Sequence, residues 1–222
     1  FEDLPDEEVG SRQLDDDTLA SYQKQFNYSA EELDSVLRVL GENGQEAVGS
    51  MGDDTPFAVL SSQPRIIYDY FRQQFAQVTN PPIDPLREDC AMSLSTQLGK
   101  ETNIFHAGPE TVNHVILNSP VLSQRKLRQL LKMDQYVQAN RLLDLSYSED
   151  EGLRAGIERI CAEAEQAARE GMVMLLLSDR YPVAGRPMVH ALLATSAIHH
   201  HLSRLGLRCD VNLIVETGTA RD

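Results

Sequence analysis

Hydrophobic positions are patterned most clearly in the last third of the chain, where apolar runs alternate with amphipathic stretches. Ser148 and Glu151 form a capping box in front of one amphipathic stretch, and Gly171 is suited to stop that helix. The expected elements are strands over residues 142–147, 172–178 and 209–216, a helix from residue 153 to the stop at Gly171, and a helix over 188–205. Strands this uniformly apolar are typical of a parallel sheet covered on both faces.

Two short helices are expected before residue 42. An amphipathic stretch follows the acidic residues 15–17 and runs to Phe26. Ser29 and Glu32 then form a capping box for a second helix, which Gly41 is suited to end. We therefore predict an α/β fold, with an open, mostly parallel sheet flanked by helices and preceded by a short helical acidic connector.

The middle of the chain is less regular. Pro64 suits the first turn of a helix, and apolar side chains between residues 66 and 75 recur on one side of it. Pro81 and Pro82 must end that helix, so residues 78–85 are expected to form a stiff loop. Later signals are weaker: they indicate short strands near residues 112–117 and a helix capped by Ser123.

Charge narrows the range of functions. The 222 residues contain 20 Lys and Arg against 34 Asp and Glu, a net charge of −14, and residues 1–54 hold 15 of the acids but only 3 bases. We divide the chain into an acidic connector, 1–54, and an α/β domain, 55–222. This balance offers no surface for nucleic acid or an anionic membrane. The longest apolar run is too short to span a bilayer, and three scattered cysteines suit a reducing cytoplasm.

The common catalytic and metal-binding motifs are missing from the sequence: it has no CxxC, GxSxG, HExxH or glycine-rich phosphate loop. Open parallel sheets bind ligands outside the carboxyl ends of their strands. At those ends this chain carries Asp179, Arg180, Glu216 and Thr217. The four side chains could hold a small anion, a nucleotide or a neighbouring domain. The alternative is that they only cap helices and form ion pairs.

Several long stretches resemble a known family. Residues 50–61 read SMGDDTPFAVLS, residues 68–88 read YDYFRQQFAQVTNPPIDPLRE, and residues 175–180 and 207–217 read LLLSDR and LRCDVNLIVET. In this order they closely resemble the central domain of the glutamate synthase large subunit. The acidic leader is similar to the connector that precedes this domain.

The resemblance implies a large oxidoreductase with several domains. One neighbour of the central domain would be an amidotransferase domain that releases ammonia from glutamine with a terminal cysteine. The other would be a (β/α)8 domain with FMN and a 3Fe–4S cluster, where ammonia and 2-oxoglutarate become glutamate. No cofactor ligand of the family matches a position here, so this segment itself is expected to hold no cofactor. NADPH and a small (beta) subunit are the expected electron donor and partner.

In the stretch most like the family, the stiff loop is expected to border the ammonia route between those two domains. The residues concerned are Thr79, Asn80, Pro81, Pro82, Asp84 and Arg87. Such a route must exclude water, because ammonia is protonated at neutral pH and the ammonium ion is a poor nucleophile. Two alternatives stay open: a loop needed only for folding, and a free-standing α/β module with a ligand at the strand ends.

Overall fold

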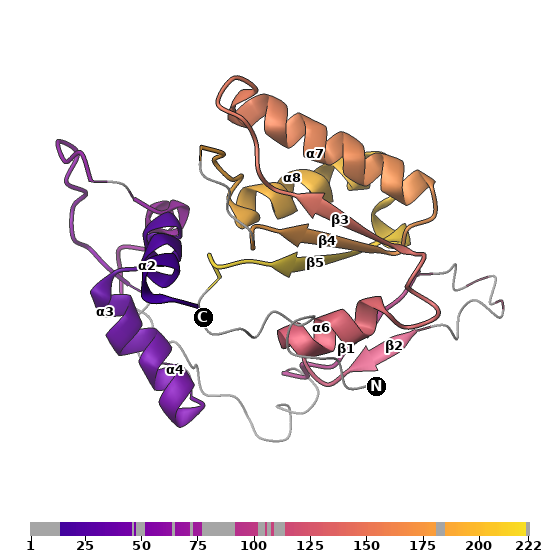
Figure 1. Cartoon of the computed structure of the whole chain (residues 1–222), viewed down its shortest axis with the longest axis horizontal. Coiled ribbons are helices and arrows are strands. Elements are labelled where there is room, and N and C mark those ends of the chain that lie inside the picture. The colour runs from indigo at the N-terminus through magenta and orange to yellow at the C-terminus, as the bar shows by residue number, and fades with distance from the viewer. Residues whose placement is uncertain are drawn as a thin grey trace. The chain divides into compact units, whose positions relative to one another are not determined.

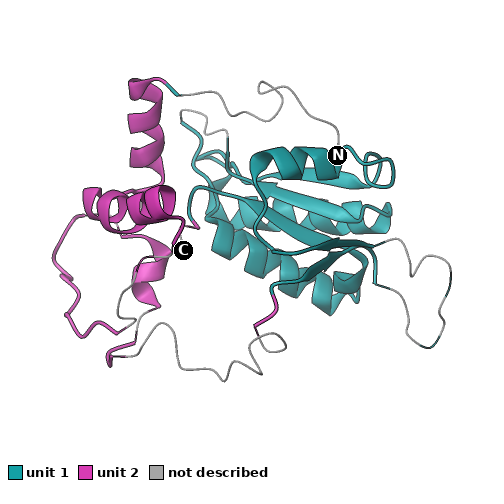
Figure 2. Ribbon diagram, turned by 90° about the horizontal axis from the view of Figure 1, so that it is seen from below, with its two compact units in different colours: residues 1–14, 94–219 teal, residues 15–93, 220–222 magenta. Residues whose placement is uncertain are grey.

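The structure, a computed structural model, describes residues 14–45, 47, 52–63, 65–71, 73–76, 92–101, 105, 108, 114–180 and 185–220 (Figure 1). They divide into two compact units (Figure 2). We call the described residues between 15 and 93 the helical unit, and those between 94 and 219 the sheet unit. The domain boundary expected between residues 54 and 55 falls inside the helical unit and stays a prediction.

The sheet unit is built on three parallel strands in the order β3, β4, β5. Their bounds are Asn140–Asp144, Met174–Ser178 and Asn212–Glu216. Helix α7 (Gly152–Arg169) connects the first two strands, and helix α8 (Ala191–Arg204) connects the last two. Both helices lie on the same face of the sheet (Figure 1). This arrangement confirms the predicted α/β fold with a parallel sheet.

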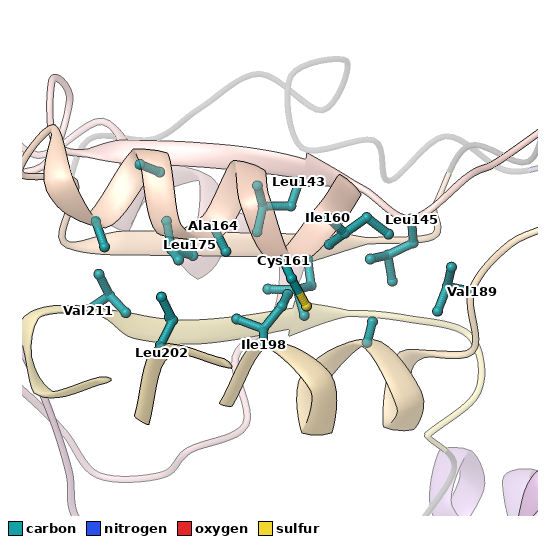
Figure 3. Packing of buried hydrophobic residues seen from close by; sticks show 14 of the residues in the cluster. Leu143, Leu145, Ile160, Cys161, Ala164, Leu175, Val189, Ile198, Leu202 and Val211 are labelled. Carbon is teal, nitrogen blue, oxygen red and sulfur yellow. The ribbon is translucent and has the colours of Figure 1, made fainter. Parts of the chain in front are cut away.

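The main hydrophobic core lies between this face and the two helices (Figure 3). Leu143 and Leu175 from the strands pack with Ile160 of α7 and with Ile198 and Leu202 of α8. Full burial of each such side chain stabilises the fold by about 1.5–3 kcal/mol. All five residues of β4 are buried, as a central strand covered on both faces requires.

The opposite face of the sheet is covered by helix α6 (Gln124–Leu131) and an antiparallel pair, β1 (Thr96–Leu98) and β2 (Val115–Leu117). Leu98, Leu130, Tyr136 and Met174 form a second core cluster there. The Tyr136 hydroxyl donates to the carbonyl of Leu98 at 3.2 Å, so this buried polar group is satisfied. Sequence patterns anticipated β2 and α6 but not β1.

Helix boundaries in the sheet unit follow the expected signals. The hydroxyl of Ser123 accepts from the Lys126 amide at 3.2 Å at the start of α6. Ser148 and Glu151 bond reciprocally before α7, at 3.2 and 3.4 Å. Gly171 follows α7 with a φ of 86°, in the left-handed region that glycine tolerates best.

The helical unit contains the two predicted helices. The first is α2 (Asp16–Gln25); the second runs without a break through α3 (Ala30–Glu32), a π-helical turn η1 (Leu33–Leu37) and α4 (Arg38–Asn43). The capping box is present, with Ser29 and Glu32 bonded reciprocally at 2.9 and 3.1 Å. The expected end at Gly41 is wrong, since α4 continues to Asn43 and Gly44 ends it with a φ of 62°.

Between residues 52 and 76 the structure contradicts the prediction of a helix. The helix expected from Pro64 to residue 75 is absent from the described part of this range, which holds only a 3-10 turn, η2 (Ile67–Tyr70). Gln73 instead pairs in a β-bridge with Gly52, and its carbonyl accepts from the Asp53 amide at 3.0 Å. A side chain at Gly52 would lie 2.0 Å from the carbonyl oxygen of Phe75, so this close approach requires glycine.

Candidate functional site

The carboxyl ends of β4 and β5 bring together the four residues predicted for the sheet edge. Ser178 and Glu216 lie opposite each other in the parallel register, and Asp179 and Thr217 follow them. The amide of Asp179 donates to the carbonyl of Glu216 at 3.2 Å. Parallel pairing therefore gathers, at one edge, side chains 38 positions apart in the sequence.

Glu216 is the centre of a half-buried ionic cluster. Its Oε1 accepts from Arg128 Nη2 at 2.6 Å and from Arg180 Nη1 at 2.9 Å, and its Oε2 accepts from the Ser178 hydroxyl at 2.9 Å. Burial is the largest single influence and acts to raise the pKa of Glu216. The hydrogen bonds from Arg128, Arg180 and Ser178 together outweigh it, so the pKa lies below its ordinary value. Glu216 is therefore held as a carboxylate between two guanidinium groups.

Asp179 lies beside this cluster and is only 2% exposed. One carboxylate oxygen accepts from the Thr217 hydroxyl, and the other accepts from the Gly218 amide at 3.1 Å. The Thr219 amide donates in turn to the Thr217 hydroxyl at 3.0 Å. Burial raises the pKa of Asp179, against the effect of its hydrogen bonds. The side chain of Asp179 thus fixes the turn by which the chain leaves β5.

Helix α6 contributes two residues that sequence reasoning missed. Arg128 reaches Glu216 across 88 positions of sequence, and the amide oxygen of Gln124 accepts from Arg180 Nη2 at 2.9 Å. Neither residue lies in a recognisable motif. Their role follows from the packing of α6 against the sheet, because the cluster of Leu98, Leu130, Tyr136 and Met174 holds the helix there. No local signal in the sequence could have identified them.

The polar side chains at this edge of the sheet find most of their hydrogen-bond partners within the protein. Both arginine side chains bond to Glu216, and each carboxylate oxygen of Glu216 and Asp179 has a protein donor. Such a network stabilises the fold, and a ligand would have to displace one of its members. Of the four residues, Arg180 and Glu216 form an ion pair, and Asp179 accepts hydrogen bonds from Thr217 and Gly218. A ligand at this edge stays a prediction.

The other candidate residues differ in what the structure describes. The predicted tunnel-bordering residues all lie outside the described part of the chain: Thr79, Asn80, Pro81, Pro82, Asp84 and Arg87. Helix α8 carries three consecutive histidines, residues 199–201, and two of them have different partners. His201 bonds to Glu165 at 2.9 Å, and His199 accepts from Arg208 at 3.2 Å. In the described ranges no group of three His, Cys, Asp or Glu side chains could hold a metal ion.

A cavity of about 350 Å³ lies in the helical unit, where sequence reasoning expected no site. Its lining combines acidic, aromatic and basic side chains: Asp53, Thr55, Pro56, Phe57, Arg65, Tyr68 and Asp69. The Phe57 ring stacks on Tyr70 with 5.6 Å between ring centroids. Arg65 and Asp69 are 3.9 Å apart, at the outer limit of an ion pair. The lining residues come from two stretches of the chain, 53–57 and 65–69.

The fold and the ionic cluster define the class of this protein. It is a parallel α/β domain in which polar side chains at the carboxyl ends of the strands bond to one another and to helix α6. In the ranges the structure describes, no helix is long and apolar enough to cross a membrane. The family model for the glutamate synthase central domain matches residues 21–222. The chain belongs to this family.

Its relatives are much longer proteins. The chain is 41% identical over 218 residues to ferredoxin-dependent glutamate synthase 2, chloroplastic, of Arabidopsis thaliana, covering 96% of this chain and 13% of the relative. It is 39% identical over 204 residues to the glutamate synthase (NADPH) large chain of Bacillus subtilis, covering 92% and 13%. For the NADH glutamate synthase of Schizosaccharomyces pombe the identity is 38% over 202 residues, covering 89% and 10%.

Proposed function

We propose that this chain works as the central segment of a glutamate synthase polypeptide that makes glutamate from glutamine and 2-oxoglutarate. In this role it links an amidotransferase domain, which releases ammonia, to a domain that holds FMN and a 3Fe–4S cluster. The observation that carries the proposal is the family match over residues 21–222. The ionic cluster around Glu216, in which the arginine side chains bond to the carboxylate, is consistent with a structural role.

The two cysteines that the structure describes, Cys161 and Cys209, lie in different surroundings, one in the core and one at the surface. A 3Fe–4S cluster needs converging thiolates. Cys161 is buried in the core of the sheet unit, where burial raises the pKa of its thiol, and Cys209 is exposed near the start of β5. FMN binding would need a phosphate site, and no glycine-rich phosphate loop occurs in the sequence. We therefore assign both cofactors, and every redox step, to other parts of the enzyme.

Within that role, residues Thr79 to Arg87 border the route of ammonia between the two active sites. Support comes from the proline-rich sequence, which stiffens the loop, and from the need to keep water out of such a route. The test is Asn80→Ala in the full-length enzyme, with Glu170→Gln on the surface of the sheet unit as a control. Glutamine hydrolysis should exceed 2-oxoglutarate consumption in Asn80→Ala and match it in the control. If coupling stays stoichiometric in Asn80→Ala, the loop does not border the route.

The electron donor is proposed to be NADPH, supplied through a small (beta) subunit in the cytoplasm. The relative of Bacillus subtilis, named as an NADPH enzyme, supports this proposal. The ferredoxin-dependent relatives define the competing outcome. Glutamate formation by the purified enzyme should proceed with NADPH when a small subunit copurifies. Formation with reduced ferredoxin alone would reject NADPH as the donor.

A further inference from the structure

The C-terminal end of helix α4 carries a chemically labile pair of residues. Asn43 is the last residue of the helix, and Gly44 caps it with a φ of 62°. They form the one Asn-Gly pair in the 222 residues of the sequence. We propose that Asn43 is a site of spontaneous modification, at which the side-chain amide is lost and an aspartate or isoaspartate residue takes its place. This inference goes beyond the proposed function and does not depend on it.

The reaction needs only the chain itself and water. The backbone nitrogen of Gly44 attacks the side-chain carbonyl carbon of Asn43, and the new C–N bond closes a five-membered imide. The bond to the side-chain nitrogen breaks, and that nitrogen leaves as ammonia with the proton that the Gly44 nitrogen gives up. Water then opens the imide at either of its two carbonyls. One opening gives aspartate, and the other gives isoaspartate, in which the main chain runs through the former side chain.

The glycine that ends the helix also makes the pair reactive. A left-handed backbone conformation after α4 favours a residue without a Cβ. Because Gly44 has no side chain, its nitrogen can approach the carbonyl carbon of Asn43 without a steric barrier from a Cβ. Both residues are exposed, so water can reach the imide that forms. The local sequence therefore supplies the nucleophile, the leaving group and access for water together.

Only a weak restraint holds this pair in the helical conformation. The Gly44 amide donates to the Leu40 carbonyl at 3.0 Å, and this bond must open before the nitrogen can turn toward the Asn43 side chain. The net strength of one such hydrogen bond slows the reaction by no more than about tenfold. No residue of α4 is buried, so core packing does not fix this end of the helix. Helix ends of this kind open locally far more often than the whole fold does.

Two other asparagines serve as standards within the same molecule. Asn118 is exposed like Asn43, but the residue after it is Ser119, which has a Cβ. Asn140 is held in place by its side chain, because its Nδ2 donates to the carbonyl of Tyr136 at 2.8 Å. The first standard isolates the effect of the glycine, and the second shows the effect of a fixed side-chain amide.

Isoaspartate at position 43 loosens the end of α4. It adds one carbon to the main chain between the helix and Gly44, so the Gly44 amide no longer meets the Leu40 carbonyl in the geometry of the cap. Either product also places a carboxylate at the C-terminal end of a helix, where the helix dipole disfavours a negative charge. The hydrogen bond that ends the helix is therefore weakened by the modification.

Peptide mapping of the full-length protein tests the site. The protein is kept in mildly alkaline buffer, and mass spectrometry of digested samples gives the rate at which each asparagine is converted. Asn43 should be converted at least about tenfold faster than Asn118, and Asn140 more slowly than either. In urea-unfolded protein the Asn43 rate should rise by no more than about tenfold, because one hydrogen bond is lost. A native rate no higher than that of Asn118, or a rise of more than about a hundredfold on unfolding, would overturn the assignment of Asn43.

The variant Asn43→Gln tests the effect on the helix. It keeps a side-chain amide, but attack by the Gly44 nitrogen would close a larger ring, so its peptide should stay unmodified under the same conditions. After equal incubation, hydrogen exchange of the Gly44 amide should be at least about tenfold faster in the converted wild type than in Asn43→Gln. Equal exchange in the two proteins, once wild type has been converted, would refute the loosening of α4.

Discussion

Replacing Glu216 with glutamine probes the ionic cluster at the sheet edge. The change keeps the volume of the side chain but removes the negative charge that lies 2.6 Å from Arg128 and 2.9 Å from Arg180. Because the pKa of Glu216 is lowered in the folded protein, the residue is a carboxylate at neutral pH. The variant therefore leaves two neighbouring guanidinium groups without their shared counter-ion.

The expected loss follows from burial. The side chains of Glu216, Arg180 and Arg128 are 11%, 13% and 19% exposed. Removing one partner of a buried ion pair costs about 3–5 kcal/mol, whereas exposed pairs contribute roughly 0–1 kcal/mol. The glutamine oxygen can still accept one of the arginine hydrogen bonds. The free energy of unfolding should therefore fall by about 2–3 kcal/mol, below the fully buried range.

Urea unfolding followed by far-ultraviolet circular dichroism measures this loss, since the chain has no tryptophan to report by fluorescence. Glu170→Gln is the matched control, because Glu170 pairs with Arg141 at 2.7 Å but the two side chains are 40% and 43% exposed. The control should lose less than about 1 kcal/mol. Equal losses in the two variants would show that burial does not set the strength of the cluster.

The same variant has an expected pH dependence. A carboxyl group whose pKa is lowered on folding stabilises the protein above its unfolded pKa, and that stabilisation is lost as pH falls through the folded pKa. For Glu216 the unfolded value is 4.5. The difference in unfolding free energy between wild type and Glu216→Gln should therefore be fully present at neutral pH and shrink below about pH 4.5. A difference that grows on acidification would contradict the assignment.

Three further changes test the core and the turn after β5. Leu175→Ala removes a fully buried side chain and should lower the unfolding free energy by about 2–5 kcal/mol in urea; a loss under about 1 kcal/mol would contradict tight packing. Gly156→Ala adds a Cβ that would lie 2.9 Å from the Cβ of Tyr147. The variant should therefore be less stable than wild type, although alanine has the better helix propensity. A raised urea midpoint would argue against this contact. Burial raises the pKa of Asp179 above its ordinary value of 3.8. The free energy of unfolding of wild type should therefore fall relative to that of Asp179→Asn as pH rises from about 3.8 through the folded pKa. A difference that does not change with pH would rule out the raised pKa.

Much of the sheet unit could be predicted from local patterns. The capping boxes and terminal glycines marked helix boundaries because these signals act over three or four neighbouring residues. The apolar run through β4 predicted a parallel sheet because only a strand covered on both faces is apolar throughout. Since parallel strands end at one edge, Asp179, Arg180, Glu216 and Thr217 could be placed together without knowing a single contact.

The helix expected across residues 64–75 shows where periodicity fails. Its apolar side chains recur at helical spacing, but spacing does not specify a surface to pack against. In the structure Gln73 pairs with Gly52, and that pairing requires an extended backbone where a helix was expected. The pairing of Gln73 with Gly52, 21 positions away, thus outweighed the local preference for a helix. No sequence motif had indicated the cavity in the same part of the chain.

By itself, the sequence determined the alternation of strands and helices in the parallel sheet, the capped starts of α6 and α7, the stop of α7 at Gly171 and the strand-end residues that meet at the sheet edge. These features depend on neighbouring residues or on simple rules of parallel topology. Only the tertiary structure decided that Arg128 and Gln124 of α6 complete the ionic cluster, and that residues 53–57 and 65–69 line one cavity. Such contacts join residues far apart in the sequence, and their geometry exists only once separate elements have packed together.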